Sequence, residues 1–210
     1  MNKTDCFISK LSEISLKDKN NIQQYFNEVA DYLFHNIAIK AGEDNFTFLE
    51  IEFYYYKKGE IEGSLFNCTY PRIREVGQFF WHYSGIDICF KSTINEKEQT
   101  FGGILIRSLM KNNQEIIAGP MCCSNELMNC CNKELPILID RETILENNPE
   151  STIRYGIEAD KGQKEMKFCY YIKPDRWART RNNVLVANKE GGYDIIKQKK
   201  YYYIAQPEKR

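Results

Sequence analysis

Residues 46–56 have the sequence FTFLEIEFYYY. Side chains alternate between the two faces of a β-strand, so this stretch has one mostly apolar face and one face that places Glu50 and Glu52 between aromatic rings. Burying a carboxylate among such rings is costly. Two interpretations follow: a sheltered pair of acids with a chemical role, or a half-solvated antiparallel strand whose polar face meets water.

Length and composition indicate an ordinary globular chain. It has 210 residues, of which 42% are hydrophobic and 28% charged, so one domain spanning 1–210 is expected. No apolar run approaches the roughly 18 residues of a membrane span, and the polar start MNKTD lacks a signal-peptide core. We therefore expect a cytoplasmic monomer that does not bind membranes.

Charge is unevenly distributed along a chain whose formal net charge is zero. Residues 161–210 hold thirteen Lys and Arg against five Asp and Glu, with aromatic residues between them. Such a segment suits contact with a phosphate backbone, although a solvated basic face has the same composition. The candidate DNA contacts are Lys164, Lys167, Lys173, Arg176, Arg179 and Arg181.

Periodicity predicts an N-terminal arm over 1–14, a helix over 15–40 that begins after Ser15 and stops before Gly42, and a sheet-rich core over 46–205. Residues 57–78 form a long loop, which is typical of a recognition segment. A mid-chain helix is expected over 121–132. The further strands are expected at 79–90, 101–109, 151–157, 166–172, 183–187, 193–197 and 201–204.

One cation stands out in the strand expected at 101–109. Arg107 lies in an apolar run, and a buried arginine needs a carboxylate partner, for which Glu50, Glu52 and Asp87 are available. Phosphate-loop, dinucleotide-binding, nucleophile-elbow and zinc-protease motifs are absent. Eight cysteines lack the spacing of a zinc site, so no metal and no cofactor are expected.

An ordered series of short motifs carries a resemblance to a known family. In chain order the motifs are EIEFY (50–54), WHYSGID (81–87), LIRSL (105–109), GP (119–120) before a helix, TIRYGI (152–157) and KFCYYI (167–172). The succession resembles the alkyladenine (3-methylpurine) DNA glycosylase family and covers roughly residues 48–177. The resemblance implies a mixed α/β (α+β) fold: a single domain with a mainly antiparallel, barrel-like sheet and with the N-terminal and mid-chain helices packed outside it.

The resemblance also implies roles for individual residues. Glu52 matches the acid that activates water, and Arg107 matches the arginine that helps to hold that water. Tyr54 matches the aromatic residue that stacks on the flipped base, and Trp81 stands where a second stacking ring is found. The implied activity is hydrolysis of the base–sugar bond of an alkylated purine in double-stranded DNA.

The sequence departs from the family pattern at the base-extruding wedge. Ser84 stands at the position of the inserted aromatic residue, so the wedge is either missing or has moved to Tyr83 or into the loop 57–78. His82 could replace a pocket histidine, and Asp87 could add a carboxylate or neutralise Arg107. Two alternatives remain: a non-catalytic interaction domain for nucleic acid or protein, and a hydrolase of a small nucleoside-like ligand.

Overall fold

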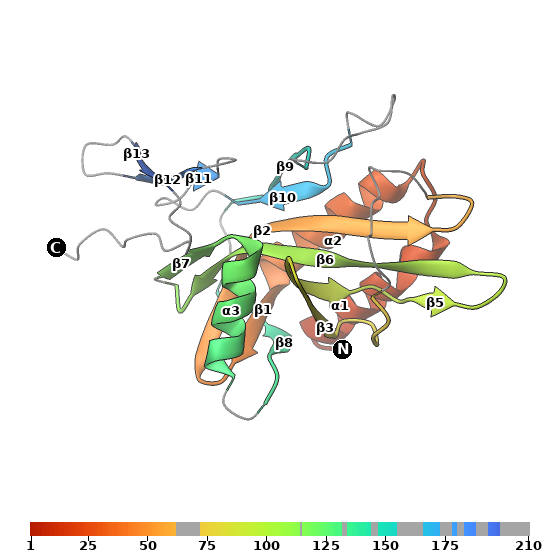
Figure 1. Cartoon of the computed structure of the whole chain (residues 1–210), viewed down its shortest axis with the longest axis horizontal. Coiled ribbons are helices and arrows are strands. Elements are labelled where there is room, and N and C mark those ends of the chain that lie inside the picture. The colour runs from red at the N-terminus through yellow and green to blue at the C-terminus, as the bar shows by residue number, and fades with distance from the viewer. Residues whose placement is uncertain are drawn as a thin grey trace.

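Two long antiparallel strands form the spine of the molecule. β2 (Asp44–Lys57) and β6 (Gln99–Lys111) pair along almost their whole length, and the main sheet runs in the order β3-β4-β6-β2-β1-β8. The computed structural model describes residues 1–61, 72–113, 115–131, 134–143, 147–154 and 166–172, and the backbone of 178–179, 183–187 and 193–197. The described residues form an α+β domain whose antiparallel sheet curls into a half-barrel (Figure 1).

Further short strands pair with these two, and three others form a sheet of their own. β10 pairs with β2 and β9, whereas β5 and β7 pair with β6, and β11 to β13 form a separate three-stranded sheet. Their bounds are β1 (Ile37–Ala41), β3 (Phe79–His82), β4 (Gly85–Cys89), β5 (Thr93–Ile94), β7 (Glu115–Ala118), β8 (Ile137–Asp140), β9 (Glu150–Thr152), β10 (Cys169–Tyr171), β11 (Ala178–Arg179), β12 (Asn183–Ala187) and β13 (Tyr193–Lys197).

Helices cover both faces of the main sheet. α1 (Lys3–Ser12), a 3₁₀ turn (Glu13–Leu16) and α2 (Ile22–Asn36) lie behind it in Figure 1, and α3 (Pro120–Cys130) lies in front. Phe26 of α2 stacks on Phe53 of β2 with ring centroids 4.3 Å apart, and Phe168 meets Phe26 edge-on at 5.0 Å. Each buried ring of this kind contributes roughly 1.5–3 kcal/mol relative to an exposed one. Within the described residues, no helix has the length and apolar character needed to cross a membrane.

The N-terminal expectations need correction. Residues 1–14 are not an arm, because α1 begins at Lys3, is capped by the side chain of Asn2 and buries Phe7 and Leu11 one turn apart. The helix predicted over 15–40 begins only at Ile22 and ends at Asn36, since Ile37–Ala41 forms β1. This apolar run suits either a helix end or a strand, and its pairing with β2 and β8 decides between them.

The segment 79–90 also differs from its prediction. It is not one strand but a hairpin, in which His82 of β3 pairs with Gly85 of β4 and Tyr83 and Ser84 form the turn. Strand predictions at 46–56 and 101–109 agree with β2 and β6, and those at 183–187 and 193–197 agree with β12 and β13. β1 and β8 were missed, so the sheet begins before residue 46. The strand predicted at 201–204 lies outside the described residues.

Candidate active site

Glu50 and Glu52 are both buried in the middle of β2. Glu50 is 5% exposed and Glu52 only 1%, and every residue from Phe46 to Phe53 is buried. The half-solvated strand left open by the sequence is therefore excluded, because α2 covers one face of this region while α3 and neighbouring side chains shelter the other. Two carboxylates at this depth require cationic or hydrogen-bonding partners.

Arg107 supplies the cation for both acids. Its Nε donates to Glu50 Oε1 at 3.0 Å, and its Nη1 lies 3.1 Å from Glu52 Oε2. The pairing of β2 with β6 shifts register on both sides of Glu50, and such irregularities redirect side chains. Burial lowers the pKa of the Arg107 guanidinium, but Glu52 and Glu50 outweigh it, so the pKa is raised above its ordinary value.

The two oxygens of Glu52 have different surroundings. Oε2 accepts hydrogen bonds from the Tyr54 hydroxyl at 2.8 Å and from Arg107. Oε1 is buried and has no hydrogen-bond partner within the described part of the chain. Burial, together with the charge of Glu52, raises the pKa of Tyr54, so its hydroxyl keeps the proton that it donates. One oxygen of the carboxylate is thus fixed, and the other can accept a proton.

Glu50 is more fully engaged than Glu52. Besides Arg107, it accepts from Ser108 Oγ at 3.3 Å and from the thiol of Cys169 at 3.5 Å. Glu50, Glu52 and Cys169 place three possible metal-ligand atoms within 4.8 Å of one another. A divalent ion bound there would compete with Arg107 for both carboxylates, so the arrangement favours a guanidinium clamp over a metal centre.

Asp87 belongs to a neighbouring group rather than to the Arg107 clamp. It pairs in register with Leu105, which in turn pairs with Glu52, so two strand spacings, about 9–10 Å, separate the two acids along the sheet. Asp87 is fully buried and forms an ion pair with Arg72, while His82 Nε2 lies 3.3 Å from its Oδ1. The cation that pairs with Asp87 is therefore Arg72, whereas the sequence had suggested Arg107.

The tip of the β3–β4 hairpin presents an aromatic ring to solvent. Tyr83 is 77% exposed in the turn, whereas the preceding His82 points back toward Asp87. Ser84 Oγ lies 2.9 Å from His82 Nδ1, and this contact fixes the imidazole between the turn and the sheet. The exposed residue at the tip is therefore Tyr83, not Ser84.

Trp81 does not join these residues. It pairs with Ile86, whereas the adjacent Asp87 pairs with Leu105 and shares the face of Glu52. Directly paired residues share a face and successive residues alternate, so Trp81 lies on the opposite face, packed beside Phe79 against the core. The stacking position implied by the resemblance is thus not filled by Trp81.

Arg154 joins the site, although the sequence assigned it no role. Its guanidinium carbon lies 4.3 Å from the centroid of the Tyr54 ring, and its Nη1 donates to the carbonyl of Phe53 at 2.9 Å. The guanidinium carbon of Arg72 lies 5.9 Å from the centroid of the same ring. Hydrophobic periodicity does not predict that an arginine stacks on Tyr54. The sequence showed only that a charged residue follows an apolar one in TIRYGI.

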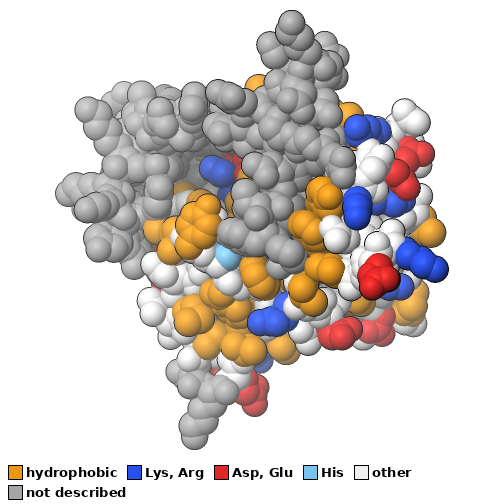
Figure 2. All heavy atoms as spheres, turned by 45° about the vertical axis from the view of Figure 1, so that its right-hand side comes forward, with side chains coloured by type: hydrophobic (Ala, Val, Ile, Leu, Met, Phe, Trp, Pro, Cys, Tyr) orange, Lys and Arg blue, Asp and Glu red, His pale blue; other side chains and the backbone are white. Residues whose placement is uncertain are grey.

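For most of the proposed DNA-contacting lysines and arginines, the structure does not describe the side chain. Lys167 is exposed, but Lys164, Lys173, Arg176 and Arg181, as well as the side chain of Arg179, fall outside the described part of the structure. On the face shown in Figure 2, acidic and basic side chains mix at the right-hand edge and apolar side chains gather near the centre. This view therefore shows no single-sign patch among the coloured residues.

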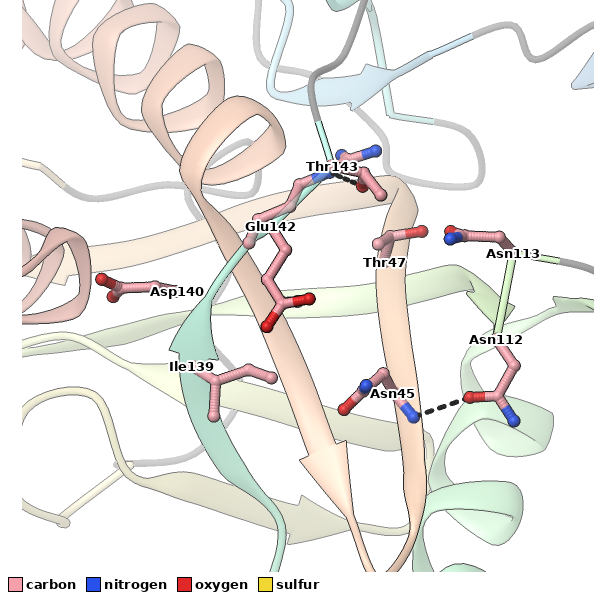
Figure 3. Close-up of a pocket in the computed structure, with 10 residues that line it drawn as sticks. Asn45, Thr47, Asn112, Asn113, Ile139, Asp140, Glu142 and Thr143 are labelled. Atoms are coloured by element: carbon pink, nitrogen blue, oxygen red, sulfur yellow. Dashed lines mark hydrogen bonds between the residues drawn. The ribbon is translucent and has the colours of Figure 1, made fainter.

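A polar pocket of about 160 Å³ lies toward the other end of β2 (Figure 3). Its lining combines Asn45 and Thr47 of β2 with Asn112 after β6 and with residues 139–143 around the end of β8. Asn112 accepts from the backbone of Asn45 at 2.9 Å. Asp140 points away toward α1, where it accepts from Thr4. These side chains serve the local structure and lie far along β2 from Glu52.

Comparison of the chain with family models, curated proteins and solved structures finds no match.

Proposed function

We propose that this protein is a DNA N-glycosylase that hydrolyses the base–sugar bond of a damaged, alkylated purine flipped out of duplex DNA. The observation that carries the proposal is the carboxylate of Glu52: it is 1% exposed, Oε2 is held by Arg107 and Tyr54, and Oε1 has no partner among the described residues. A fixed, sheltered carboxylate with one unengaged oxygen suits a general base.

The chemistry follows from this arrangement. Glu52 Oε1 accepts a proton from a water molecule as the water oxygen bonds to C1′ of the sugar, and the bond from C1′ to the base breaks with its electron pair on the base. Negative charge on Glu52 also stabilises the positive charge that develops on the sugar. Arg107 holds the carboxylate of Glu52 in place, while Glu50 balances the charge of Arg107.

Duplex DNA as the substrate is supported by the hairpin tip. An enzyme that acts on a base inside a duplex must extrude the base, and an inserted side chain commonly fills the gap. Tyr83 is an exposed ring on a short turn, anchored through its neighbour His82 to the buried Asp87. This is a rigid position for a wedge, and it is the position next to the one that the family resemblance indicates.

The test measures release of free base from duplex oligonucleotides that carry one alkylated purine. Wild type should release base, and Glu52→Gln should lower the rate by about 10²–10⁴-fold because it removes the general base while keeping the shape. Glu50→Gln is the matched control: it alters the same arginine clamp but leaves Glu52 in place, so a smaller loss is expected. Tyr83→Ala should slow release from duplex far more than from single-stranded DNA.

The same assay separates the alternatives. Absence of release from every duplex and single-stranded substrate, with intact fold, would reject the glycosylase. Salt-sensitive DNA binding without release would instead identify a non-catalytic interaction domain. Turnover of free nucleosides, unaffected by Tyr83→Ala, would identify a hydrolase of small ligands.

A further inference from the structure

The β3–β4 hairpin holds a serine, a histidine and an aspartate in a hydrogen-bonded series. Ser84 Oγ lies 2.9 Å from His82 Nδ1, and His82 Nε2 lies 3.3 Å from Asp87 Oδ1. A hydroxyl on one imidazole nitrogen and a carboxylate on the other is the arrangement that activates a serine nucleophile on several unrelated folds. In the proposed glycosylase, none of these three side chains takes part in breaking the base–sugar bond.

The backbone of the turn determines which imidazole nitrogen carries the proton. The amide N–H of Ser84 is directed at His82 Nδ1 at 3.4 Å, and an amide N–H can only donate a hydrogen bond. Nδ1 is therefore the unprotonated nitrogen, and it accepts from the Ser84 hydroxyl as well. The ring proton is then on Nε2, where it faces the carboxylate of Asp87. In this tautomer His82 can take the proton of the serine hydroxyl.

The imidazole and its carboxylate are held from several sides. The His82 side chain is 5% exposed, and its ring stacks on Phe80 with centroids 6.0 Å apart and meets the Tyr83 ring edge-on at 6.4 Å. Asp87 is fully buried, and its Oδ2 is bound by Arg72. Because Oδ2 is occupied, Oδ1 is the oxygen that faces the imidazole. The base is thus oriented before any ligand arrives.

Ser84 is the member of the series that a substrate can reach. It is half-buried in the turn, beside Tyr83, whose side chain is 77% exposed. The Tyr83 ring offers an apolar surface for an acyl group, and the charges of Asp87 and Arg72 cancel beneath it. An uncharged ester suits these surroundings better than a charged one. Ser92 is a useful contrast, because its hydroxyl donates to the carbonyl of Arg72 at 3.0 Å, and a carbonyl does not act as a base.

We propose that Ser84, His82 and Asp87 form a second catalytic site, which hydrolyses uncharged carboxylic esters. Ser84 Oγ bonds to the ester carbonyl carbon while its proton moves to His82 Nδ1. The bond from that carbon to the alkoxy oxygen then breaks, and this oxygen leaves with the electron pair and takes the proton from Nδ1. Water repeats the two steps on the acyl-serine: its oxygen bonds to the carbonyl carbon, and Ser84 leaves with the electron pair and regains a proton through Nδ1. Asp87 accepts from Nε2 in both halves of the reaction.

Labelling of the full chain with an alkyl fluorophosphonate tests the nucleophile. An activated serine displaces fluoride and keeps the phosphonyl group, and peptide mass spectrometry identifies the residue that carries it. We expect the label on Ser84 and not on Ser92. Ser84→Ala should also reduce hydrolysis of p-nitrophenyl acetate to the rate in buffer. Absence of label on Ser84 in the folded wild type, or equal labelling of Ser84 and Ser92, would overturn the proposal.

Two further measurements test whether the histidine activates the serine. His82→Gln removes the base and should slow labelling of Ser84 about 10²-fold or more, whereas Ser92→Ala is the matched control and should be labelled like wild type. Thermal unfolding verifies that the variants are folded. Wild type unfolded in urea provides a measurement that needs no variant, because separating Ser84 from His82 should abolish the labelling. Labelling that is undiminished in folded His82→Gln or in urea would show that Ser84 reacts without the histidine, and would reject the site. Neither probe contains DNA, so the result is independent of base release.

Discussion

Two cations on β6, four residues apart, each bind two acids, and the two clusters differ in how deeply their acids are buried. Arg107 holds Glu50 and Glu52, whose side chains are 7% and 1% exposed. Lys111 holds Asp44 at 3.0 Å and Glu126 at 2.8 Å, with side chains 27% and 16% exposed. The charge pattern is the same, but the first pair of acids is sealed in the protein.

The difference in burial changes what each cluster contributes. Lys111 joins β2 and α3 to the end of β6, where solvent screens the charges and weakens their attraction. The Arg107 cluster carries the desolvation cost of three buried or partly buried ions, and replacing such clusters with apolar residues is often neutral or stabilising. A costly arrangement that leaves one carboxylate oxygen unengaged is what a site for chemistry requires.

Replacing Arg107 by Met should give the largest effect. The change leaves Glu50 and Glu52 buried without their cation, and breaking a buried pair in this way costs about 3–5 kcal/mol. Urea unfolding at pH 7 measures the loss.

A triple variant supplies the control for that prediction. Adding Glu50→Gln and Glu52→Gln to Arg107→Met removes the two charges that were left alone, so most of the lost stability should return. A single variant that is destabilised by less than about 1 kcal/mol, the range of surface ion pairs, would show that the two clusters are energetically alike. That result would contradict the interpretation of the Arg107 cluster as a site for chemistry.

The same substitution at Lys111 should have a much smaller effect. Lys111→Met removes the contacts with Asp44 and Glu126, which are partly exposed, so a loss of up to about 1 kcal/mol is expected. Unfolding measured in low and in about 1 M salt separates the contributions, because salt should weaken the Lys111 cluster and leave the Arg107 cluster nearly unchanged. A salt-independent loss of several kcal/mol would mean that methionine disrupts the packing of α3 instead.

The spine of the fold and the central contact were predictable from sequence for a physical reason. Long alternating runs specify β2 and β6, and an arginine in an apolar strand demands an acid, which Glu50 and Glu52 provide. The structure places Glu50 in the interior with Glu52, and both acids contact the same arginine.

Other parts of the site depend on pairing that a single sequence does not encode locally. Trp81 lies on the wrong face because the turn at 83–84 interrupts the alternation, and a slip of one residue moves a side chain across the sheet. Arg72 reaches Asp87 from fifteen residues away, and Arg154 reaches Tyr54 from about a hundred. Such contacts form only after the sheet has closed, so the hydrophobic periodicity of the sequence does not predict them.

The smallest expected effect is a pH-dependent loss of stability when Asp44, an acid of the Lys111 cluster, is replaced. Hydrogen bonds from Asn112 and Lys111 lower the pKa of Asp44 below its ordinary value of about 3.9. A carboxyl group whose pKa is lower in the folded state stabilises the fold above the unfolded-state pKa, and this contribution is lost as the pH falls through the folded-state pKa. Asp44→Asn should therefore lower the melting temperature slightly at pH 7, and the difference from wild type should shrink steadily below about pH 4.

Glu43→Gln, in the adjoining turn, is the control for a change of net charge alone and should show no such trend. A wild-type advantage that persists unchanged down to pH 2.5 would mean that Asp44 acts through its shape and hydrogen bonding alone, and that the Lys111 cluster is less electrostatic than its geometry indicates.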